Sequence, residues 1–179
     1  MNLVIDANIF AGYYKESVIG LNDNNLTSST IPIFNRLGIN DKCYFDCDGM
    51  ICLEWKSLAE PEWFDVWYAD SLRDAKIVEI QAESCVALKK TLRLKGFPSS
   101  KDIWYIRTCK GVKDRNSSIF LITEDLDFYD PAKKNCPHKT RIKILKASSG
   151  EVAKHLKKKE NILVKSVIKY NEIINSEAN

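Results

Sequence analysis

The chain has 179 residues, of which 45% are hydrophobic and 28% are charged, as in an ordinary soluble globular domain. Its formal net charge of +3 is too small to indicate a nucleic-acid partner by itself, and no apolar run approaches the roughly 20 residues that span a membrane. Asp6 interrupts the apolar stretch near the N-terminus, which disfavours a signal peptide, and six cysteines without a secretion signal are typical of reduced thiols. We therefore expect a cytoplasmic protein with no membrane partner.

Short apolar strands alternate with helices along the chain. Leu3, Val4 and Ile5 run directly into Asp6, and the apolar residues 119–122 run into a group of acids. Continuous apolar runs of this length are typical of strands buried on both faces. The predicted strands are residues 2–6, 42–46, 77–80, 119–122 and 141–145. The predicted helices are residues 7–16, about 27–38, 50–59, one from Pro61, residues 83–95, one after the SSKD sequence at 99–102, and one or two basic helices after residue 147.

This alternation predicts the fold class. Strands that alternate with helices form parallel sheets, so we expect an α/β protein, a three-layer α/β/α sandwich around a central parallel sheet. Residues 141–145 alternate charged and apolar side chains, as an edge strand does. We expect residues 1–147 to form this domain and residues 148–179 to form a C-terminal helical extension packed on it.

Acidic residues recur where the predicted strands end and the predicted helices begin. These residues are Asp6, Glu54, Asp102, Asp125 and Asp127. Each one has a structural explanation, as a helix cap, a turn residue or a solvated helix residue. In a right-handed α/β sandwich, however, all these places lie on one rim, and that rim is where ligands bind. Together the acids predict a carboxylate-lined metal site.

The same segments resemble the ordered acidic motifs of PIN-domain nucleases. The resemblance is carried by LVIDANIF, by Glu54-Trp55 after the FDCDGMI turn, by SSKDIWYI and by LITEDLDF, and it spans about residues 1–147. It implies a strand order of 3-2-1-4-5 and a divalent-metal site. The helix after the third motif departs from the family, because WYIRTC replaces the usual small residues.

Matching the motifs implies a role for each acid. The four catalytic acids would be, in chain order, Asp6, Glu54, Asp102 and Asp125. Asp127 matches a frequent extra acid of the family, and Asn8 and Thr123 fit the polar positions beside the first and fourth acids. VapC-like toxins belong to this family. The resemblance therefore allows a toxin or defence role, an antitoxin or other protein regulator, and a homodimer.

Physical chemistry suggests how such a site works. Crowded carboxylates repel one another, and a bound Mg²⁺ or Mn²⁺ relieves the repulsion and can activate a water for attack on a phosphodiester. We assign the ion to Asp6, Asp102, Asp125 and Asp127. Glu54 would orient or deprotonate the attacking water, and Asn8 and Thr123 would fix carboxylate rotamers. The predicted function is a metal-dependent endoribonuclease, because the family usually cuts RNA. The sequence itself does not distinguish RNA from single-stranded DNA.

Basic and aromatic residues offer candidates for binding the nucleic acid. Arg93 lies on one predicted helix, and Lys101, Arg107 and Lys110 surround the third acid. Such residues can follow a phosphate backbone, with Trp55, Trp104 or Tyr105 available for base stacking. Solvated helix faces and core aromatics explain the same residues equally well.

Two other functions fit parts of the sequence. Asp46 and Asp48, in FDCDG, match the nucleophile motif of haloacid-dehalogenase-type phosphatases, with Asp46 as nucleophile and Asp48 as general acid. That motif normally follows the first core strand, whereas here a strand ending in Asp6 precedes it, and a plain turn explains the same residues. The other alternative is a catalytically inactive PIN-like fold that serves as a binding module.

Overall fold

The computed structural model describes residues 1–21, 25–98, 102–112 and 118–177. Within these residues, five parallel strands form one sheet in the order β3-β2-β1-β4-β5. The strands are β1 (Asn2–Ile5), β2 (Lys42–Asp46), β3 (Ile77–Ile80), β4 (Ile119–Ile122) and β5 (Ile162–Lys165). The predicted fold class and strand order are therefore confirmed.

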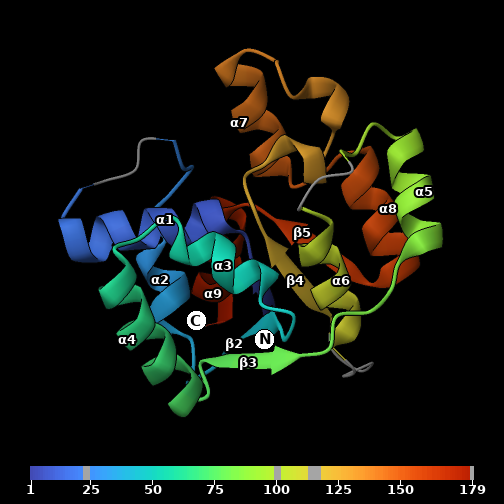
Figure 1. Cartoon of the computed structure of the whole chain (residues 1–179). Helices are drawn as coiled ribbons and strands as arrows, with labels where there is room; N and C mark the ends of the chain where they lie inside the picture. Colours follow the sequence, from blue (N-terminus) through green and yellow to red (C-terminus); the bar gives the residue numbers. More distant parts are fainter. Residues whose placement is uncertain (22–24, 99–101, 113–117, 178–179) are drawn as a thin grey trace.

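Helices cover both faces of the sheet. They are α1 (Ala7–Tyr14), which continues into a π-helical turn η1 (Lys15–Ile19), α2 (Ile31–Asn35), α3 (Met50–Lys56), α4 (Pro61–Arg73), α5 (Val86–Leu94), α6 (Ile103–Gly111), α7 (His138–Ala147), α8 (Glu151–Glu160) and α9 (Val167–Glu177). Two 3₁₀ turns, η2 (Leu126–Phe128) and η3 (Pro131–Lys133), follow β4. Figure 1 shows α1, α2 and α4 on one side of the sheet and α5, α6 and α8 on the other, which gives three layers.

The position of the edge strand differs from the sequence prediction. Residues 141–145, expected as an edge strand, lie in α7, and the edge is formed by β5, which pairs with β4. Ile142 and Leu145 are three residues apart, a spacing that also suits one face of a helix, and Leu145 is fully buried. Ile162 and Val164 instead alternate as a strand requires, and both are buried. Residues 148–179 are therefore not a wholly helical extension, because they supply one strand of the central sheet.

An aromatic cluster anchors α1 and α3 beside the sheet. Trp55 is fully buried and stacks on Phe10, with ring centroids 4.3 Å apart, and it meets Phe45 of β2 edge-on at 4.7 Å. Such aromatic pairs contribute beyond the area that they bury. The prediction that Trp55 is available for base stacking is therefore wrong. Its burial instead fixes α3, and with it the neighbouring Glu54.

The carboxyl ends of β1, β4 and β5 lie side by side. The Asp6 N–H donates to the Ile122 carbonyl oxygen at 2.9 Å, and the Thr123 N–H donates to the Lys165 carbonyl oxygen at 3.0 Å.

On the β2–β3 side of the sheet, the end of α6 approaches the backbone that follows β3. A Cβ at Gly111 would lie 2.3 Å from the Gln81 carbonyl oxygen, so only glycine allows this packing. None of the described helices combines the length and apolar character needed to cross a bilayer.

Candidate functional site

Asp6 forms the centre of the candidate site. It lies at the end of β1, is 4% exposed and caps α1. One carboxylate oxygen accepts a hydrogen bond from the Asn8 backbone N–H at 3.1 Å, and the other accepts one from the Thr123 hydroxyl at 2.6 Å. Burial raises the pKa of Asp6 from 3.8 to about 7, against these two hydrogen bonds and with help from the negative charges of Asp125 and Glu54. At neutral pH, Asp6 is thus poised between its charged and neutral forms.

Thr123 connects Asp6 with the acids that follow β4. Its hydroxyl donates to Asp6 and accepts a hydrogen bond from the Asp125 backbone N–H at 3.0 Å. Asp125 in turn accepts from the Asp127 N–H at 2.9 Å and caps η2. Thr123 is fully buried, so this arrangement is shielded from water. Asn8 contributes through its backbone N–H, while its side chain is exposed.

Glu54 reaches the same edge from α3. Its Oε2 accepts a hydrogen bond from the Tyr105 hydroxyl at 2.8 Å, and the Tyr105 oxygen accepts one from the Ala7 N–H at 3.0 Å. Tyr105 is 1% exposed, so it links α3, α6 and the start of α1 from within the core and is not available for base stacking.

Asp102 and Asp127 form the other side of the site. Asp102 directly precedes α6 and is half-buried. Burial raises the pKa of Asp127, and the charges of Asp125 and Asp102 act in the same direction, whereas an ion pair with Lys134 opposes them. Asp125 therefore interacts electrostatically with Asp6 on one side and with Asp127 on the other. The charges of Glu54 and Asp125 thus act on Asp6, and those of Asp125 and Asp102 act on Asp127, and we refer to these five acids as the acid row.

Within the described residues, the acid row is not a ready-made chelating site. Within residues 1–21, 25–98, 102–112 and 118–177, no three acidic, histidine or cysteine side chains already converge closely enough to chelate an ion unaided. Mg²⁺, however, keeps several waters and takes only one or two protein carboxylates directly. Lys134 forms an ion pair with Asp127 here, and a divalent ion held by these carboxylates, partly through water, stays a prediction.

Beside the acids the surface is hollowed. A depression of about 580 Å³ lies between α1, η3 and α7 and is bordered by Asp125 and Asn8. Its basic residues are Lys15, Lys134 and Arg141. The Arg141 guanidinium donates to the Glu124 carbonyl oxygen, and the buried Glu124 carboxylate accepts from the Thr27 N–H at 3.0 Å. A negative row next to a hollow with basic residues can receive a phosphate chain.

A scan against protein-family models, a search of curated proteins and a search of solved structures each find no match.

The residues predicted to bind nucleic acid have varied positions. Arg107 donates to the Glu83 carbonyl oxygen at 3.0 Å and lies 3.8 Å above the Trp104 ring, and Lys110 pairs with Glu160. Arg93 is exposed on α5, whereas Lys101 lies outside the described residues. Arg107 and Lys110 thus have partners within the protein, and the structure places Lys134 and Arg141, which sequence reasoning missed, beside the acid row.

Asp46, at the carboxyl end of β2, stabilises the start of α3. Its side chain is fully buried, and its two carboxylate oxygens accept hydrogen bonds from the Met50 N–H at 2.7 Å and the Ile51 N–H at 2.9 Å. Both oxygens therefore hold the start of α3. Asp48 is exposed in the turn. This arrangement favours the turn interpretation over a phosphoryl-accepting nucleophile.

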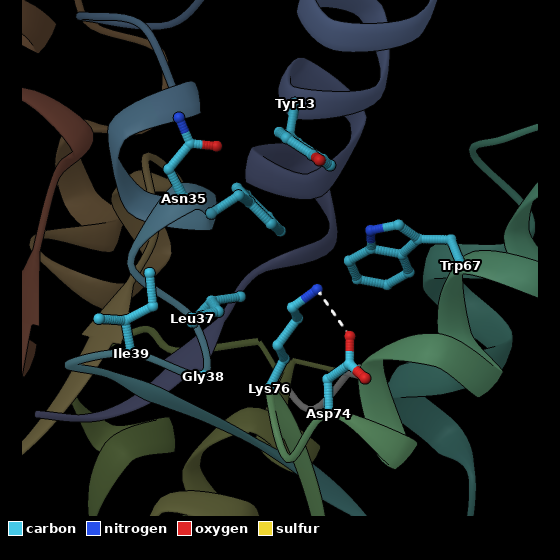
Figure 2. Close-up of a pocket in the computed structure, with 9 residues that line it drawn as sticks. Tyr13, Asn35, Leu37, Gly38, Ile39, Trp67, Asp74 and Lys76 are labelled. Atoms are coloured by element: carbon cyan, nitrogen blue, oxygen red, sulfur yellow. Dashed lines mark ion pairs between the residues drawn. The ribbon is translucent and has the colours of Figure 1, made fainter.

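A second hollow, of about 400 Å³, lies at the opposite edge of the sheet, before β2 and β3. Figure 2 shows the Trp67 indole and the Tyr13 ring above an ion pair between Lys76 and Asp74, which are 3.2 Å apart. This hollow contains none of the predicted site residues, so it does not bear on the acid row.

Proposed function

We propose that the chain is a Mg²⁺- or Mn²⁺-dependent endoribonuclease of the PIN-domain kind, with its reaction centre at the carboxyl edge of β1 and β4. The observation that carries this proposal is the placement of Asp6, a buried carboxylate linked through the Thr123 hydroxyl to the Asp125 backbone, with a raised pKa and with Asp125 and Glu54 as negative neighbours. Strongly perturbed acids at the ligand-binding edge of a parallel sheet are typical of functional sites.

Asp6, Asp102, Asp125 and Asp127 would hold the ion, directly or through water. When bound, the ion would lower the pKa of a water and offset negative charge on the phosphodiester. The strand order supports this proposal, since it is the order that the resemblance to PIN-domain nucleases implies.

Residues around the acids would prepare the site for the reaction. The Thr123 hydroxyl and the Asn8 N–H fix the two oxygens of Asp6, so its rotamer is set before any ligand arrives. The Tyr105 hydroxyl holds one oxygen of Glu54 and leaves the other to accept a proton from the attacking water. The basic hollow beside Asp125 would receive the phosphate chain of RNA or of single-stranded DNA.

Cleavage of a mixed single-stranded RNA pool tests the proposal. We expect cleavage with Mn²⁺ or Mg²⁺, none with excess EDTA, and a loss of at least about 100-fold in Asp125→Asn, since a positioned charge at the reaction centre is removed. Asp48→Asn is the matched control, because the same change is made in an exposed turn of the same sheet edge. Its activity should equal that of the wild type.

Three outcomes would contradict the proposal. Cleavage that survives EDTA or the Asp125→Asn change would exclude the acid row as the reaction centre. Hydrolysis of p-nitrophenyl phosphate that is lost in Asp46→Asn but kept in Asp6→Asn would favour the phosphatase. Binding of RNA without cleavage under either metal would favour the inactive binding module.

A further inference from the structure

Lys134 lies between the acid row and the hollow. It directly follows η3 and forms an ion pair with Asp127, whose side chain is 3% exposed, while 55% of the lysine side chain is exposed. The ammonium group therefore covers a buried carboxylate from the solvent side. The same lysine also lines the hollow that would receive the phosphate chain.

The charges around Lys134 come from several elements. Besides Asp127, the carboxylates of Asp125, at the start of η2, and of Asp102, before α6, also act on its ammonium group. A single positive charge in this position offsets part of the repulsion within the row. It must also weaken the attraction of the row for a divalent ion, because like charges near one another repel.

We propose that Lys134 is a built-in counter-ion of the acid site, which holds Asp127 in the metal-free chain, gives way to a divalent cation and then contacts a phosphate of the substrate in the hollow. This inference rests on the proposed nuclease function and assigns one residue a part in both metal binding and substrate binding. A lysine suits the exchange, because its ammonium is a point charge on a flexible four-carbon stem, without the fixed geometry of a bidentate arginine.

Calorimetric titration with MnCl₂, in the absence of RNA, tests the first half of the exchange. Lys134→Met should bind Mn²⁺ about tenfold more tightly than the wild type, since a competing charge has been removed. The matched control is Lys133→Met, which changes the neighbouring exposed lysine and should leave the affinity unchanged. In an Asp127→Asn background, the effect of Lys134→Met should be smaller than in the wild type, because the ion pair that holds the ammonium at the acid row is already lost.

Steady-state cleavage of single-stranded RNA at saturating Mn²⁺ tests the second half. Lys134→Met should raise the KM for RNA about fivefold or more, although it binds metal more tightly, and Lys133→Met should not. If Lys134 had only a structural role, its replacement would not strengthen Mn²⁺ binding and at the same time raise the KM for RNA.

The results separate failure of this inference from failure of the proposed function. Unchanged or weaker Mn²⁺ binding by Lys134→Met, together with lost binding in Asp125→Asn, would overturn the role of Lys134 and leave the nuclease standing. An unchanged KM in Lys134→Met would overturn the substrate contact. Absence of Mn²⁺ binding in both wild type and Lys134→Met would overturn both proposals.

Discussion

Replacing Asp6 with asparagine should stabilise the metal-free protein at high pH while abolishing cleavage. The folded-state pKa of about 7 lies above the ordinary value of 3.8, so the folded chain binds this proton more tightly than the unfolded chain does. Ionisation of Asp6 therefore costs stability as the pH rises from about 4 to about 7. The gap between the two pKa values corresponds to about 4 kcal/mol in the free energy of unfolding.

A lost hydrogen bond reduces this gain. Asp6 accepts from both the Thr123 hydroxyl and the Asn8 N–H, whereas asparagine has only one acceptor oxygen, so one bond of about 1 kcal/mol is lost. In EDTA we expect Asp6→Asn to match the wild type within about 1 kcal/mol at pH 4, where the folded Asp6 is itself protonated, and to be about 3 kcal/mol more stable at pH 8. Urea denaturation at the two pH values measures both differences.

Asp41, which lies at the amino ends of the strands, provides a control in which the same substitution should have the opposite effect on stability at pH 8. Burial acts to raise the pKa of Asp41, but the Arg36 guanidinium and the N-terminal ammonium of Met1, each 2.8 Å from a carboxylate oxygen, outweigh it with help from the Tyr170 hydroxyl and hold the pKa below its usual value. Its charge thus stabilises the fold above the unfolded-state pKa, and Asp41→Asn should destabilise the protein at pH 8. If Asp6→Asn lowered stability equally at both pH values, or retained cleavage, the reasoning about Asp6 would be refuted.

Two further substitutions test the supports of the site. Tyr105→Phe removes the hydroxyl that holds Glu54, so in steady-state kinetics we expect kcat to fall about tenfold at unchanged KM. The same change leaves the Ala7 N–H without its acceptor, so the free energy of unfolding in urea should fall by about 1–3 kcal/mol. Gly111→Ala places a methyl group 2.3 Å from a backbone oxygen, so it should cost about 1–3 kcal/mol in a thermal melt, and a wild-type melting temperature would contradict the close approach of α6.

The sequence predicts most of the fold because local signals and tertiary packing agree there. β2 and β3 have the predicted bounds, since each is a short apolar stretch between turn residues. Local signals and tertiary packing disagree at the outermost strand of the sheet. Residues 141–145 have a period-two pattern and also a helical spacing, and only the pairing of β5 with β4 decides between them. That pairing joins residues far apart in sequence, so no local pattern reveals it.

The candidate site shows the same difference between local signals and long-range contacts. The places of Asp6 and Asp125 could be predicted, because each follows a buried strand, whereas their part in catalysis stays a prediction. Thr123 was predicted to fix a carboxylate beside the fourth acid, but its bond to Asp6 and the bond of Tyr105 to Glu54 could not be predicted, because they join residues 117 and 51 positions apart. Trp55 was misassigned for a related reason. An aromatic residue beside a catalytic candidate has the same local sequence whether it faces solvent or, as here, stacks on Phe10 in the core.

Comparison of Asp46 with Asp6 distinguishes a structural acid from a candidate functional one at the carboxyl ends of the strands. Both follow a strand and accept hydrogen bonds at a helix start, but Asp46 gives both oxygens to backbone N–H groups, a task that needs a carboxylate and nothing more. Asp6 caps α1 with one oxygen, which asparagine or serine would do without charge, and its neighbours Asp125 and Glu54 are themselves negative. The Asp6 carboxylate therefore lowers the stability of the metal-free protein at neutral pH. A cation that binds beside it would restore that stability. Mg²⁺ or Mn²⁺ should therefore stabilise the wild type more at pH 8 than at pH 5, and this difference should disappear in Asp6→Asn.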